Sequence, residues 1–150
     1  MKLARLGTKG MEKPAIVDNA GNYRDLSSVI PDITGETLED LTWVDGIDIN
    51  SLPAIPAGTR IGPCVGKIGK LICVGLNYSD HAAETGNPIP KEPILFGKAT
   101  SSIIGPNDNV VIPRGSAKTD WEVELGIVIA REAKYVSEEK VKSTPRRRVK

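Results

Sequence analysis

The sequence has little histidine and little cysteine, and each shortage excludes a class of protein. Among the 150 residues there is one histidine, His81, and there are two cysteines, Cys64 and Cys73. A metal site built on several histidines is therefore excluded, so any metal ion must be held mainly by carboxylates. Two cysteines are too few for a disulfide framework, which fits a reduced cytoplasmic setting.

Charge of one sign and long apolar runs are also missing. The 20 basic and 19 acidic residues give a formal net charge of +1, whereas a dedicated nucleic-acid-binding protein shows a basic excess. No apolar run approaches the ~20 residues of a membrane span. Residues 1–7 contain no apolar core of a secretion signal. We therefore expect a cytoplasmic protein that binds neither nucleic acid nor a membrane.

The order of turn formers and apolar runs predicts an α+β protein, mostly β, in two parts. A cluster of turn formers predicts a hairpin over residues 15–26, and leucine spacing predicts a short helix within 34–41. Residues 44–63 are rich in Asp, Gly and Pro and predict an irregular connection. We expect a small N-terminal module over residues 1–58, followed by a second domain over 59–139.

The second domain alternates short strands with short helices. Strands are predicted over 70–75, 93–98, 101–105, 109–112 and 121–130. Helices are predicted over 79–84 and from residue 137, the second ending before Pro145.

Two glutamates lie on one face of the predicted strand 121–130. Side chains alternate along a strand, so Glu122 and Glu124 share a face. The opposite face is apolar and consists of Trp121, Val123, Leu125, Ile127 and Ile129. The glutamates are either solvated side chains of a half-buried strand or a carboxylate pair that holds a hard divalent cation, which would remove their mutual repulsion.

A histidine and a glutamate lie three residues apart on the predicted helix 79–84. At that spacing His81 and Glu84 are neighbours on the helix surface. The carboxylate would fix the imidazole tautomer for general-base work, or the two would form an ordinary surface ion pair. Lys98, which ends the strand 93–98, is either solvated or in contact with an anionic substrate.

Several motifs follow one another in an order that resembles the fumarylacetoacetate hydrolase family. These are Val74-Gly75-Leu76-Asn77-Tyr78, Asp80-His81-Ala82-Ala83-Glu84-Thr85-Gly86, Pro93-Ile94-Leu95-Phe96-Gly97-Lys98, Ile104-Gly105 and the run from Asp120 to Ile129. The opening is similar to the N-terminal module of bacterial members described as ureidoglycolate lyase or 2,4-diketo-3-deoxy-sugar-acid hydrolase. The resemblance covers residues 1–139 and the first half of a family member.

The resemblance implies a mixed β-roll, incomplete here, with a divalent metal at its mouth. Glu122 and Glu124 would be two of three carboxylate ligands of Mg²⁺ or Mn²⁺, with Ca²⁺ as a further candidate. His81 and Glu84 would be the catalytic dyad, and the substrate-binding residues would be Tyr78, Phe96 and Lys98. The implied reaction cleaves a C–C bond of a 2-keto or β-diketo acid through a metal-stabilised enolate. A homodimer is expected of the full-length family protein.

The chain departs from the family pattern after residue 139. The third ligand in the family is an aspartate on a later strand, and no aspartate follows Asp120. Residues 140–150 form a basic tail unlike the family. We expect a product truncated by a frameshift, or else a genuine short protein. Such a chain would leave the apolar face of 121–129 uncovered and would be poorly folded or inactive, so a non-catalytic fragment is the alternative function.

Overall fold

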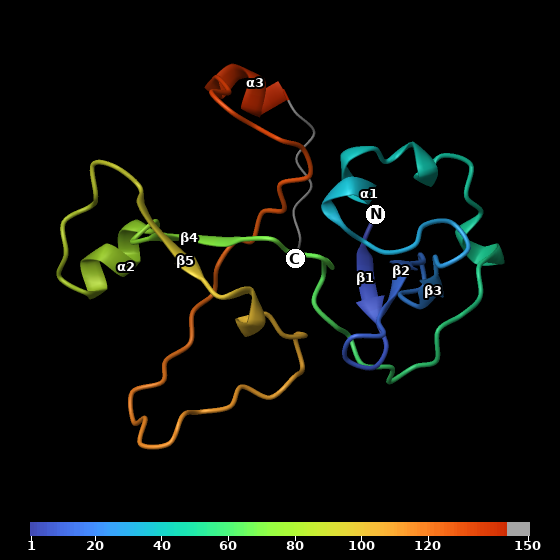
Figure 1. The fold of residues 1–150 in the computed structure, drawn as a ribbon, viewed down its shortest axis with the longest axis horizontal. Helices are drawn as coiled ribbons and strands as arrows, with labels where there is room; N and C mark the ends of the chain where they lie inside the picture. Colours follow the sequence, from blue (N-terminus) through green and yellow to red (C-terminus); the bar gives the residue numbers. More distant parts are fainter. Residues whose placement is uncertain (144–150) are drawn as a thin grey trace. The chain divides into compact units, whose positions relative to one another are not determined.

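Figure 1 shows the computed structural model, which describes residues 1–143. The chain divides into two compact units. The first contains Met1–Lys67 and the chain from Ile104 onward, and the second is Ile68–Ile103. The predicted domain limits at residues 58 and 139 stay predictions, and most of the predicted basic tail lies outside the described residues.

The first unit is built on a three-stranded antiparallel sheet. Its strands are β1 (Leu3–Leu6), β2 (Lys13–Val17) and β3 (Tyr23–Asp25), in the order β1-β2-β3 (Figure 1). The register pairs Ala4 with Ala15 and Ala15 with Asp25. The predicted hairpin over residues 15–26 is therefore confirmed, and β1 is an additional strand that the sequence pattern did not indicate.

Asp18 holds the hairpin turn together. Its carboxylate accepts hydrogen bonds from the backbone N–H of Ala20 at 2.9 Å and of Asn22 at 2.8 Å, and from Nε of Arg24 at 2.9 Å. The hydrogen bond from Asn22 and the guanidinium of Arg24 hold the pKa of Asp18 below its usual range. The turn formers of the sequence thus act through one buried, fully bonded carboxylate.

The buried core lies almost entirely in the N-terminal part of the first unit. Its largest fully buried side chains are Ile16, Leu26, Ile33 and Pro14. Within the described part of the chain, Ala82 is the one buried hydrophobic residue beyond Val65. Residues 1–65 therefore bury apolar surface as a folded domain does, whereas residues 66–143 do so hardly at all.

A chain of five charged side chains joins the sheet to later segments of the same unit. The carboxylate of Glu12, whose side chain is 4% exposed, lies 2.8 Å from Nη1 of Arg60 and 3.8 Å from Nη2 of Arg5. Arg5 also binds both oxygens of Asp32, at 2.7 and 3.0 Å. Arg60 binds both oxygens of Asp108, one of them at 2.7 Å. This ion network holds the turn at Asp108 against the strands.

The second unit contains a two-stranded sheet and one helix. Strand β4 (Leu71–Gly75) pairs antiparallel with β5 (Ile94–Lys98), and α2 (Ser79–Glu84) lies between them in sequence. The predictions for 70–75, 79–84 and 93–98 are confirmed. Every residue of β5 is exposed, and β4 alternates half-buried with exposed residues, so the sheet is at most partly covered on one face.

Three predicted strands are wrong. Residues 101–105 contain the end of a 3-10 turn, η3 (Thr100–Ser102), and residues 109–112 have no regular structure. Residues 121–130 are irregular apart from a single bridge residue at Ile127. The physical reason is that a strand needs a ladder of hydrogen bonds to a neighbour. Neither sheet in the described structure offers residues 121–130 such a neighbour.

The helices are short. Helix α1 (Gly35–Glu39) begins at Thr34, whose hydroxyl and backbone N–H exchange hydrogen bonds with Thr37, and it confirms the prediction within 34–41. Two 3-10 turns, η1 (Thr42–Val44) and η2 (Ile49–Ser51), follow. Helix α3 (Glu138–Ser143) confirms the helix from residue 137. Within residues 1–143, no helix has the length and apolar character that crossing a membrane requires.

The contact between Arg60 and Asp108 predicts a pH dependence of stability. The hydrogen bonds from Arg60 lower the pKa of Asp108 from 3.8 to about 2. Asp108 therefore contributes stability above about pH 4 that is lost as the pH falls through about 2. We expect the variant Asp108→Asn to unfold at lower urea concentration than the unchanged chain at neutral pH, with the difference shrinking between about pH 4 and about pH 2.

Paired urea unfolding curves across this range measure the effect. Carboxylates outside the ion network titrate in the same way in both proteins, so the difference reports Asp108 and Glu12, which shares Arg60 with it. A difference that stays constant from neutral pH to about pH 2 would contradict the assignment.

Candidate functional site

Helix α2 carries the two residues predicted as the catalytic dyad. Asp80 lies in its first turn, and its carboxylate oxygen accepts a hydrogen bond from the backbone N–H of His81 at 2.9 Å. The helix ends at Gly86, whose φ of +69° is a left-handed conformation that glycine adopts without strain. The N–H of Asn87 then bonds to the carbonyl of Ala82 at 2.9 Å and closes the helix end.

The dyad residues share the helix but do not touch. His81 is half-buried and Glu84 is exposed. Among residues 1–143, no hydrogen bond or ion pair joins the imidazole to the Glu84 carboxylate. The spacing of three residues still places both side chains on one side of the helix. The dyad therefore stays a prediction, and so does the alternative of a surface ion pair.

A cavity of about 480 Å³ lies at the start of helix α2. It is lined within the second unit by the end of β4, the turn into the helix and the segment before β5, namely Val74, Gly75, Leu76, Asn77, Ser79, Ile89, Pro90, Lys91, Glu92 and Pro93. The backbone leaves β4 through Leu76 at a φ of +49°, which an L-residue with a branched side chain rarely adopts. Strain of this kind is common where a backbone turn shapes a binding site.

Sequence reasoning missed the polar groups of this cavity. Asn77 and Ser79 offer neutral hydrogen-bonding groups, and Lys91 and Glu92 offer one charge of each sign. A signal for the first two was present, because binding groups commonly gather where a strand end meets a helix start. No sequence signal pointed to Lys91.

The structure brings Lys98 and Phe96 together. Both lie on one face of β5, and Nζ of Lys98 is 5.9 Å from the centroid of the Phe96 ring, a cation–π contact. On the neighbouring strand β4, a Cβ added at Gly75 would lie in ordinary van der Waals contact with the ring, at 3.6 Å. Tyr78 lies just before α2, at its N-cap. The substrate-binding roles of these three residues stay predictions.

The predicted metal ligands lie in the first unit. Glu122 and Glu124 are exposed on an irregular segment. In the part of the chain that the structure describes, neither carboxylate accepts a hydrogen bond or pairs with a cation, and no three acidic, histidine or cysteine side chains are grouped to hold a metal. Carboxylate oxygens without other partners are the ligands that Mg²⁺ and Mn²⁺ prefer. The two glutamates therefore offer the right type of ligand atom, but too few ligands to fill the coordination sphere of the ion.

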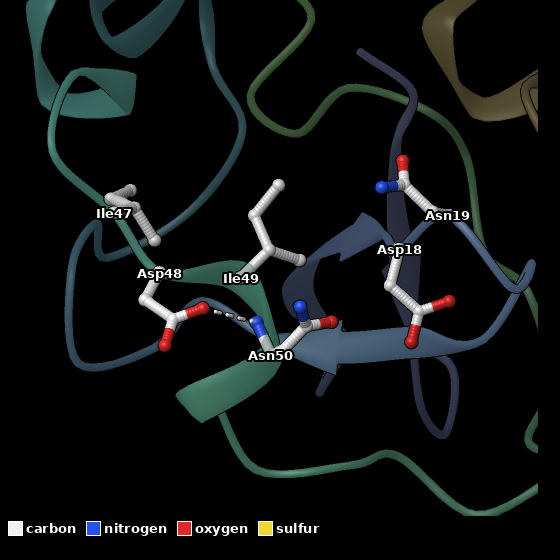
Figure 2. Close-up of a pocket in the computed structure, with 6 residues that line it drawn as sticks. All are labelled: Asp18, Asn19, Ile47, Asp48, Ile49 and Asn50. Atoms are coloured by element: carbon white, nitrogen blue, oxygen red, sulfur yellow. Dashed lines mark hydrogen bonds between the residues drawn. The ribbon is translucent and has the colours of Figure 1, made fainter.

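A smaller cavity of about 180 Å³ lies in the N-terminal part of the first unit (Figure 2). Its lining residues are Asp18, Asn19, Ile47, Asp48, Ile49 and Asn50. Asp18 is bonded to the hairpin turn, and Asp48 accepts the N–H of Asn50 at 3.0 Å as the N-cap of η2. Both carboxylates thus have structural partners, and none of the predicted site residues lines this cavity.

Comparison with protein families identifies the family of this chain. The family model described as "Fumarylacetoacetate (FAA) hydrolase C-terminal" matches residues 70–144, half of the chain. That span contains every residue that the sequence predicted for the site. The matched span begins beside β4 and includes α2, β5 and the segment 121–130.

Curated proteins with similar sequences are twice as long. A "Putative hydrolase" of Burkholderia orbicola is 57% identical over 140 residues, which cover 92% of this chain and 50% of that protein. A "Putative hydrolase" of Burkholderia cenocepacia is 58% identical with the same coverage. The chain therefore spans about half the length of the curated relatives it matches.

A solved structure among the matches has a similar fold. A crystal structure titled "a putative HpcE protein from Mycobacterium smegmatis" superposes with a TM-score of 0.55, covering 77% of this chain and 42% of that one. The sequence identity is 24%, so the comparison supports a shared fold and nothing finer. It agrees with the small mixed α/β fold described above, whereas closure into a β-roll stays a prediction.

Helix α2 should depend on the glycine at its end. A Cβ at Gly86 in a left-handed conformation costs roughly 1–2 kcal/mol. We expect Gly86→Ala to loosen the last turn of α2 and to speed hydrogen exchange at the amide of Asn87, measured by NMR. Gly69→Ala is the matched control, since Gly69 has open space around its Cβ position and no positive φ. Equal exchange in both variants would contradict the role of Gly86.

Proposed function

Because the chain belongs to the fumarylacetoacetate hydrolase family, we propose that its residues serve a divalent-metal-dependent hydrolase or lyase that acts on a 2-keto or β-diketo acid. The observation that carries the proposal is the family match over residues 70–144, which contains all the predicted site residues. The names of the curated relatives support a hydrolase. Enolate chemistry fits a diketo acid better than ureidoglycolate, so we favour C–C bond cleavage.

Each predicted residue has a chemical role in this proposal. Glu122 and Glu124 would hold Mg²⁺ or Mn²⁺, with Ca²⁺ as a further candidate. The bound ion would supply Lewis-acid stabilisation of the charge that develops on the keto acid. His81 would accept a proton from the attacking water, and Glu84 would orient the imidazole.

Substrate recognition falls to the second unit. Lys98, held over the Phe96 ring, would pair with the substrate carboxylate, because an ammonium is a compact partner for an anion. Tyr78 would contribute a hydroxyl beside the dyad helix. Cytoplasmic location, the absence of nucleic-acid and membrane partners, and a homodimer of the full-length protein belong to the same proposal.

A non-catalytic fragment is the second candidate function. The observation that favours it is the carboxylate pair without a third acidic, histidine or cysteine neighbour in the described residues. Hard divalent cations prefer six or more oxygen ligands, of which two carboxylates supply few. The two candidates make different predictions for two measurements. One is the binding of a divalent metal by Glu122 and Glu124, and the other is the turnover of a keto acid by a chain of the relatives' full length.

Metal binding by the chain itself tests the role of the glutamates. We expect the 150-residue chain to bind Mn²⁺ weakly, with a dissociation constant of roughly 1 mM, the weak end for carboxylate sites. The double variant Glu122→Gln/Glu124→Gln should lose this binding. Electron paramagnetic resonance of free Mn²⁺ measures both, with Glu132→Gln as the matched control. Unchanged binding in the double variant would contradict the ligand assignment.

Activity is tested in a chain of the relatives' full length. We expect a chimera of residues 1–139 and the half of the Burkholderia orbicola relative that this chain does not match to cleave an acylpyruvate with Mg²⁺. His81→Asn should lower kcat by about 10²–10⁴, the usual contribution of a general base. The readout is loss of the diketo-acid absorbance, with Glu132→Gln as control. A folded chimera without turnover would contradict the proposed function.

A further inference from the structure

The ion network of the first unit lies beside both places where the chain passes between the two units. The chain leaves the first unit after Lys67 and returns to it at Ile104. We call residues 62–66 the departing segment and residues 104–108 the returning segment. Both segments belong to the first unit and both contact the network, which consists of Arg5, Glu12, Asp32, Arg60 and Asp108.

The departing segment lies directly against the pair of Arg5 and Asp32. The N–H of Gly62 donates a hydrogen bond to the carbonyl of Arg5 at 2.7 Å, and Nη1 of Arg5 donates one to the carbonyl of Pro63 at 3.3 Å. A Cβ added at Gly66 would clash with a carboxylate oxygen of Asp32 and would lie 3.1 Å from Nη2 of Arg5. The backbone is therefore packed against this ion pair as closely as glycine allows.

The returning segment contacts the same network and the departing segment as well. Arg60 binds both carboxylate oxygens of Asp108, one of which also accepts the N–H of Gly105 at 2.8 Å. Gly105 is buried, and a Cβ added there would clash with the carbonyl of Ile61 and would lie 3.2 Å from Cα of Gly62. The two segments are therefore in contact, although the whole second unit lies between them in the sequence.

Glu12 joins the two sides of the network. Its side chain is 4% exposed, and its carboxylate lies 2.8 Å from Nη1 of Arg60 and 3.8 Å from Nη2 of Arg5. Removing one partner of a buried ion pair leaves the other charge uncompensated, and members of one network influence one another energetically. We therefore expect a change at Asp108 to weaken the contacts of Arg5, through Arg60 and Glu12.

We propose that the ion network is a clasp that closes the loop formed by the departing segment, the second unit and the returning segment. The clasp opens as one unit, so that both segments are released together while the sheet β1-β2-β3 stays folded. Closing such a loop costs chain entropy, which the charge-assisted bonds of the two arginines offset. The inference rests on contacts within the first unit and is independent of the proposed catalytic function.

Native-state hydrogen exchange of the 150-residue chain in low urea tests the clasp, because it reports which amides open together. We expect the amides of Gly62, Gly66 and Gly105 to share one opening free energy and one urea dependence, both smaller than those of Val17 in β2. Amides of the two segments that open at different free energies, or that open only together with Val17, would overturn the proposal.

Breaking the network on one side tests whether the two sides are coupled. Asp108→Asn, on the return side, should speed exchange at Gly62 and Gly66 by roughly tenfold or more, because it leaves a buried charge without its partner. Asp32→Asn, on the departure side, should have the same effect at Gly105. Acceleration that stays on the substituted side would show two separate attachments and would overturn the proposal.

Lys13→Gln is the matched control. Lys13 pairs with Asp25 at 3.3 Å on the same sheet and outside the ion network, so this variant should leave exchange in both segments unchanged. Glu12→Gln, which removes the charge that the two arginines share, should speed exchange in both segments at once. An equal effect of Lys13→Gln, or an effect of Glu12→Gln on one segment alone, would overturn the proposal.

Discussion

A backbone segment becomes a strand only where a neighbouring strand forms hydrogen bonds with it. This constraint separates the N-terminal sheet, where the strands pair, from residues 121–130, which form no strand. Strands β1, β2 and β3 satisfy one another and bury Ile16 and Leu26 beneath them. Residues 121–130 have an equally strong apolar alternation and form no strand, because neither sheet of residues 1–143 runs beside them. Burial of apolar surface follows the same division, so stability is concentrated where pairing is complete.

The residues proposed for the chemistry lie mainly where little apolar surface is buried. The family match covers residues 70–144, and within the described part of that span Ala82 is the one buried hydrophobic residue. His81 and Glu84 are positioned by a helix of six residues, and Glu122 and Glu124 by irregular backbone. A catalytic site needs side chains held by packed neighbours. The proposed site residues therefore lie on backbone that buries little apolar surface within residues 1–143.

Local signals in the sequence predicted local structure well. Turn formers around Asp18, the capping threonines of α1 and the glycine after α2 act within a few residues, so the hairpin and both helices were predictable. The strand at 121–130 was predicted from an equally clear pattern and is absent, because pairing is a non-local property that alternation cannot supply. The ion network through Glu12 and Arg60 was not predicted, since charge pairs separated by 48 residues leave no trace in the sequence.

The site was predictable as a set of residues and not as a geometry. The order of motifs identified the family correctly, and the contact of Lys98 with Phe96 follows from their spacing of two on a strand. The cavity lined by Asn77 and Lys91 forms because the segment just before β5 lies next to the start of α2. That path is set by tertiary contacts, which sequence periodicity does not encode.

Native-state hydrogen exchange of the 150-residue chain tests the central claim, that packing is complete in the N-terminal part and incomplete around residues 121–129, which carry the proposed metal ligands. Exchange reports the free energy of opening amide by amide. The account predicts strong protection of the amides in β1, β2 and β3, and exchange near the rate of an unfolded chain over residues 121–129. Comparable protection in both regions would contradict it.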